Sequence, residues 1–180
     1  MRTMEVTGRS PDGAIQATVT GDNRLRLYFQ PRTYEWYDER GLSRQLSALG
    51  TTTWVAWARR REEIVRVALG RSRTEQQWIR ERSGGFADGS YAARLRELDG
   101  VGRSSGGAVL LRLRGMTRWH VDIAEGTIRN WPERRFAEEA ESAFGALIAD
   151  RTMRLALLRA EHFEIGVPRR WRERAESAGE

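Results

Sequence analysis

The sequence contains no cysteine and no lysine, and these two absences set the first limits on what the chain can do. Without cysteine there is no disulfide, no thiolate metal ligand and no cysteine nucleophile. Without lysine, a Walker-type phosphate loop is excluded. The N-terminal segment MRTMEVTGRS has no apolar signal region, and no apolar run approaches the roughly 18 residues of a membrane span. We therefore expect a cytoplasmic protein with no membrane partner.

Histidine is also scarce, and the groups that support catalysis are not brought together by the sequence. His120 and His162 lie in different predicted elements, and neither has a carboxylate nearby at ligand spacing. Acid pairs such as Glu62 and Glu63 are adjacent on a predicted helix, where neighbouring side chains do not face one another. The residues present suggest no nucleophilic, acid–base or metal chemistry. We expect no enzyme activity, no catalytic residue, no metal and no cofactor.

All 31 basic residues are arginine, and they exceed the 25 acids by six formal charges, with a pI near 10.7. The excess lies in residues 1–71 and 101–180, whereas residues 72–100 are neutral. A cationic surface favours phosphate backbones or other anionic partners. The acids are interleaved with the arginines, however, so much of this charge is also what a solvated surface would carry.

The stretch from Met4 to Arg66 occurs twice, at an offset of about 94 residues. Gly8-Arg9-Ser10 matches Gly102-Arg103-Ser104, and the register continues without a gap through two strand-like runs and a helix. Two β-β-α segments could also match loosely by pattern alone. The ungapped register and the shared GRS and GA pairs favour a duplication.

Each repeat is predicted to form a small antiparallel sheet followed by a long helix, which makes the fold class α+β. The alternating runs 14–20 and 24–30 predict one hairpin, and 108–114 and 118–123 predict the other. A helical period begins at Asp38, with Asp38 or Ser43 as N-cap, and again at Pro132. A shorter helix is expected over Tyr91–Leu98.

These elements divide the chain into a first unit at 1–70, a linker at 71–90, a second unit at 91–167 and a basic tail at 168–180. Each unit alone is small for a stable core. We therefore expect the two units to share a core or to pair.

The late parts of the two long helices concentrate arginine, with Trp54 and Trp57 beside it in the first. Spacings of three, four and seven place several guanidinium groups on one flank of a helix, which suits a row of phosphates. The alternative is a solvated helix face paired with acids such as Glu62, Glu63 and Asp150. The candidate DNA-binding residues are Arg59, Arg60, Arg61, Arg66, Arg151, Arg154 and Arg159.

The order of these features resembles the YbaB/EbfC family of nucleoid-associated proteins. The resemblance rests on Val-Thr-Gly before a short turn, Gly-Ala-Ile and Val-Thr-Gly in the next strand, Gln30-Pro31 after the following strand, and an acid-led helix ending in Ala58–Ile64. It covers Met4 to about Arg66, and Leu98 to about Phe163 through the repeat.

The resemblance implies an α-β-β-β-α unit that dimerises through its sheet, projects helices like tweezers and binds duplex DNA with weak sequence preference. Two departures matter: the first repeat lacks the family's long leading helix, and the second has only Tyr91–Leu98 in its place. A tandem copy would let the units pair within one chain as a pseudo-dimer, replacing the usual homodimer. The leading hypothesis is a non-enzymatic, nucleoid-associated DNA-binding protein.

The alternative is a protein-interaction or adaptor module on the same scaffold, similar to accessory proteins of type VII secretion systems. Tyr34, Trp36, Tyr37 and Trp131 would favour this role if they formed one exposed patch. Burial of these rings between the repeats would weaken it.

Overall fold

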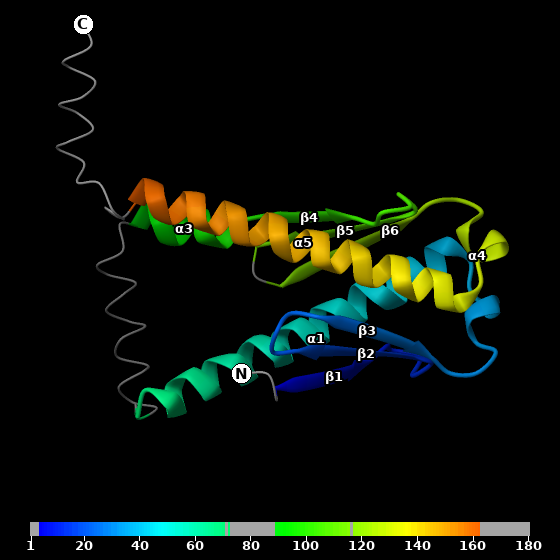
Figure 1. The fold of residues 1–180 in the computed structure, drawn as a ribbon, viewed down its shortest axis with the longest axis horizontal. Coiled ribbons are helices and arrows are strands. Elements are labelled where there is room, and N and C mark those ends of the chain that lie inside the picture. Colours follow the sequence, from blue (N-terminus) through cyan, green and yellow to red (C-terminus); the bar gives the residue numbers. More distant parts are fainter. Residues whose placement is uncertain (1–3, 71, 73–88, 116, 163–180) are drawn as a thin grey trace, which may run out of the picture.

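The structure, a computed structural model, describes residues 4–70, 72, 89–115 and 117–162 and is α+β, with two similar units, as the sequence predicts (Figure 1). The first unit comprises β1 (Glu5–Arg9), β2 (Ile15–Thr20), β3 (Leu25–Phe29), the 3-10 helix η1 (Tyr34–Trp36) and α1 (Glu39–Ala68). The second comprises α3 (Gly89–Glu97), β4 (Gly100–Arg103), β5 (Val109–Arg114), β6 (Arg118–Ile123), α4 (Thr127–Asn130) and α5 (Glu133–His162). Nearly all of the predicted linker and all of the predicted tail lie outside the described residues.

The register of the repeat is visible in the bounds of the elements. Helices α1 and α5 both contain 30 residues, and their first residues, Glu39 and Glu133, stand 94 positions apart. The strand orders are β1-β2-β3 and β4-β5-β6, both antiparallel. Cross-strand pairs correspond as well, since Ala17 pairs with Leu27 and Leu111 pairs with Val121.

The turn between the first two strands of each unit is built in the same way. In the first unit the Ser10 hydroxyl accepts a hydrogen bond from the Ile15 amide at 2.9 Å, and Gly13 adopts φ 76°. In the second unit Ser104 accepts the equivalent bond at 3.1 Å, and Gly107 adopts φ 77°. Glycine is favoured at both positions because a side chain destabilises the left-handed conformation.

Helix α1 begins after Asp38, whose side chain accepts a hydrogen bond from the Gly41 amide at 2.6 Å. Of the two caps that the sequence offers, Asp38 is therefore the one used. The helix is continuous through Gly50 and the threonines that follow it. Its buried face consists of Leu42, Leu46, Leu49, Thr53 and Trp57.

The long helices hold the two units together, because each contacts both sheets. Helix α1 packs on β1 and β2 of its own unit and on β6 of the other, while α5 packs on β4, β5 and β3. Phe136 of α5 meets Phe29 and Tyr34 of the first unit, at ring-centroid distances of 6.0 and 5.5 Å. The two units consequently share one hydrophobic core.

Strands β3 and β6 lie at sheet edges, and each receives a side chain from the opposite unit. The Leu27 amide of β3 donates to Glu141 of α5 at 3.4 Å, and the Val121 amide of β6 donates to Ser47 of α1 at 3.0 Å. These contacts occupy equivalent positions of the repeat. They satisfy edge amides that would otherwise lack a partner within the chain.

Candidate nucleic-acid interface

Toward their C-termini α1 and α5 diverge, and the end of α5 lies beside α3 (Figure 1). We call residues 58–68 of α1 and 150–161 of α5 the helix arms. All seven arginines that the sequence singles out lie on these arms.

Three of the four candidate arginines on the α1 arm are exposed. Arg59 and Arg60 are exposed and form no ion pair with any part of the chain that the structure describes. The guanidinium of Arg61 lies over the ring of buried Trp57, 5.2 Å from its centroid. Arg66 is different, because it forms an ion pair with Glu63 at 2.6 Å.

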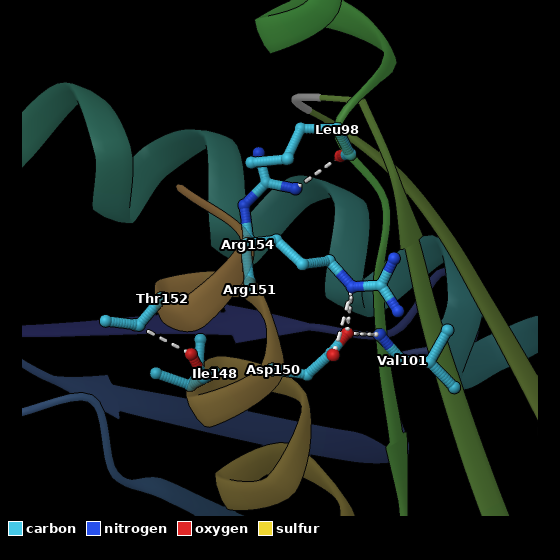
Figure 2. Close-up of polar contacts among 7 residues, drawn as sticks. All are labelled: Leu98, Val101, Ile148, Asp150, Arg151, Thr152 and Arg154. Carbon is cyan, nitrogen blue, oxygen red and sulfur yellow. Dashed lines mark hydrogen bonds and ion pairs between the residues drawn. The ribbon is translucent and has the colours of Figure 1, made fainter. Parts of the chain in front are cut away.

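The α5 arm uses two of its three candidate arginines for internal contacts, which Figure 2 shows. Arg151 is half-buried and donates to the Leu98 carbonyl oxygen at 2.8 Å. Burial lowers the pKa of Arg151, although the nearby Asp99 acts in the opposite direction. Arg154 pairs with Asp150 at 2.9 Å, which leaves Arg159 as the exposed arginine without such a contact among the described residues.

The predicted site therefore divides into two groups. Arg59, Arg60, Arg61 and Arg159 offer exposed guanidinium groups. Arg66, Arg151 and Arg154 already have partners within the chain. For Arg66 and Arg154 the partner is an acid, as in the alternative that the sequence leaves open. The pairs Glu63–Arg66 and Asp150–Arg154 lie at helical spacings of three and four, which the sequence can indicate. Arg151, in contrast, meets the Leu98 carbonyl only through the fold.

The four aromatic residues that would favour an adaptor do not form one exposed patch. Tyr34 is only 3% exposed and packs between the units, whereas Trp36 is 78% exposed. The Tyr37 hydroxyl donates to Asp12 at 2.6 Å. Trp131 is half-buried, with the Arg135 guanidinium 4.2 Å from its ring centroid. The single exposed patch that would favour an adaptor is therefore not formed by these four residues.

A cleft of about 880 Å³ lies where the 3-10 helix η1 faces α4, away from the arms. Its walls include the equivalent residues Glu39 and Glu133 at the starts of the two long helices. Glu39 accepts a hydrogen bond from the Ile128 amide at 3.2 Å, and partial burial raises the pKa of Glu133. More acids than arginines line this cleft, so it is poorly suited to a phosphate.

The two histidines of the chain lie apart from the arms' arginine contacts described above. His120 lies 3.0 Å from Asp122, which also pairs with Arg112 at 3.2 Å on the exposed face of the second sheet. His162 is the last described residue of α5. Within 4–70, 72, 89–115 and 117–162, no group of three or more acids and histidines could hold a metal ion. No helix in those ranges is long and apolar enough to cross a membrane.

Comparison with protein-family models, with curated proteins and with solved structures found no match for this chain.

Proposed function

We propose that this chain is a non-enzymatic DNA-binding protein of the nucleoid-associated type, which holds the phosphates of duplex DNA with arginines of its two helix arms. The observation that supports this most is the run of three exposed arginines, Arg59, Arg60 and Arg61, late in a long helix. Arg159 adds a cation on the other arm. Guanidinium groups suit phosphate oxygens, and contacts of this kind carry no direct sequence information.

In this proposal the two units act as an internal pseudo-dimer. Because α1 and α5 each pack on both sheets, the arms are held by one shared core, and their separation depends on that core. A family homodimer would supply two identical arms. Here a single chain supplies two arms that differ in their exposed arginines without an ion pair among the described residues, with three on α1 and one on α5.

The test is fluorescence anisotropy with a labelled duplex across a salt series. The arm variant changes Arg59, Arg60, Arg61 and Arg159 to glutamine. A matched control changes Arg26, Arg40, Arg44 and Arg129, which are also exposed but lie outside the arms. Both variants lose four positive charges, so a general effect of net charge would weaken them equally.

We expect wild-type binding to fall steeply with salt, because each neutralised phosphate contributes about 0.9 to the logarithmic slope. The arm variant should lose at least about tenfold in affinity and show a shallower slope, while the control keeps most of both. Equal losses of affinity in the two variants would show that the arms are not the specific contact surface for DNA. Absence of salt-sensitive binding would overturn DNA binding altogether and leave the adaptor role as the competing proposal.

A further inference from the structure

Strand β1 has an outer edge whose backbone groups are open to another strand. The Gly21 amide donates to the Met4 carbonyl at 2.6 Å, and the Ser10 amide donates to the Ile15 carbonyl at 2.9 Å. Hydrogen-bonded pairs alternate along an antiparallel ladder, so the backbone groups of Glu5, Thr7 and Arg9 point away from β2. Within the described part of the chain, no other group bonds to them.

The equivalent edge in the second unit is capped at one amide. The Val101 amide of β4 donates to Asp150 at 2.9 Å, and Asp150 is itself held by Arg154 at 2.9 Å (Figure 2). Val101 corresponds to Thr7 in the repeat, and Asp150 corresponds to Ala56. The methyl group of Ala56 cannot accept a hydrogen bond, so the first unit lacks the side-chain acceptor that caps the edge amide in the second.

The sequence of β1 is complementary to itself when two copies run antiparallel. With Thr7 opposite Thr7 of a second copy, Glu5 of each strand lies opposite Arg9 of the other. In this register all three outward-facing residues fall at hydrogen-bonding positions. The exposed side chains of Glu5 and Arg9 then form two opposite-charge cross-strand pairs.

We infer that β1 is a self-association edge, through which two copies of this chain join their first sheets into one continuous six-stranded antiparallel sheet. Figure 1 shows β1 at the outer margin of the molecule, on the far side of its sheet from β3. This surface is separate from the contacts that unite the two units within one chain. It is also independent of the proposed DNA contacts, which use the arms.

Sedimentation velocity over about 5 µM to 1 mM tests the inference, because a five-residue strand addition is smaller than a standard interface and should be weak. The variants are Glu5→Arg, Arg9→Glu, the double exchange of both, and Ala56→Asp. Ala56→Asp reproduces the capped amide of the second unit. Arg60 occupies the position equivalent to Arg154 and can pair with the new carboxylate.

We expect the wild-type chain to dimerise and each single charge reversal to weaken dimerisation by about tenfold. The double exchange should restore it, since opposite charges again face each other. Ala56→Asp should abolish it without lowering the thermal midpoint, because the new carboxylate accepts the Thr7 amide from within the chain. A chain that stays monomeric throughout overturns the inference. So does a dimer that these four variants leave unchanged, since it would use another surface.

Discussion

At the scale of the residue, Tyr34 combines a well-packed ring with a buried hydroxyl group that is not satisfied within the described residues. Its ring packs on Phe29 at 5.2 Å and on Phe136 at 5.5 Å, but its oxygen is buried without a hydrogen-bond partner in the described part of the chain. A buried polar group without a partner costs about 1–3 kcal/mol. Burial, together with the charges of Glu39 and Glu133, raises the pKa of Tyr34 to about 12.

We therefore expect Tyr34→Phe to increase the free energy of unfolding by about 1 kcal/mol at neutral pH, since the ring contacts are kept and the unpaired oxygen is removed. Because folding raises the phenol pKa, the free energy of unfolding also falls as the pH rises from about 10 towards 12. The variant should lack this alkaline loss.

Urea unfolding at pH 7 and at several values above pH 9 measures both effects. Tyr37→Phe is the comparison, because it removes the hydroxyl that donates to Asp12 and should destabilise the protein at neutral pH. If Tyr34→Phe is destabilising at pH 7, the hydroxyl has a favourable partner and is not an unsatisfied group.

At the scale of the element, the contact between α5 and β4 depends on the absence of a side chain. A methyl group at Gly102 would overlap the Ala143 carbonyl oxygen and the backbone of Leu147. The helix therefore lies directly against the strand. Gly145 in the same helix is exposed, and a methyl group there would meet no atom within 4 Å.

We expect Gly102→Ala to lower the free energy of unfolding by about 2 kcal/mol or more, because helix and strand must separate. Gly145→Ala should raise it by up to about 1 kcal/mol, because alanine favours the helix without a new contact. Denaturant unfolding of the two variants measures this difference in sign. Similar stabilities for both would contradict the close approach.

Much at this scale could be predicted from the sequence. The period of apolar residues identifies both long helices and the paired strands β2–β3 and β5–β6, and it predicts the buried faces through Leu42 and Phe136. Strand β4 gives no such signal, because two of its four residues are glycine. The internal contact of Arg151 could not be predicted either, because the sequence pattern of an arginine on a helix flank is the same whether the side chain is solvated or packed.

At the scale of the whole molecule, the shared core makes each unit depend on the other. Phe136 is fully buried and packs against the rings of Phe29 and Tyr34 from the first unit. Hydrophobic period alone tells which residues are buried but not what they are buried against. The crossing of α1 and α5 onto opposite sheets therefore could not be predicted from the pattern, although the need for a shared core could.

We expect the chain to unfold in one cooperative transition, with equal calorimetric and van't Hoff enthalpies. Phe136→Ala should cost about 3–5 kcal/mol and keep a single transition at a lower temperature, since its cavity lies between the units. Differential scanning calorimetry with circular dichroism measures both quantities. Two resolved transitions in either protein would show that the units fold separately.

The contact between Leu27 and Glu141 joins residues 114 positions apart. The N-terminal sheet is synthesised first, and its apolar face stays partly uncovered until α5 has been synthesised. Pairings of such long sequence separation slow folding, because the intervening loop must close before they can form. Helix α5 thus completes the first unit, and a nascent chain halted before it would expose Phe29 to chaperones and proteases.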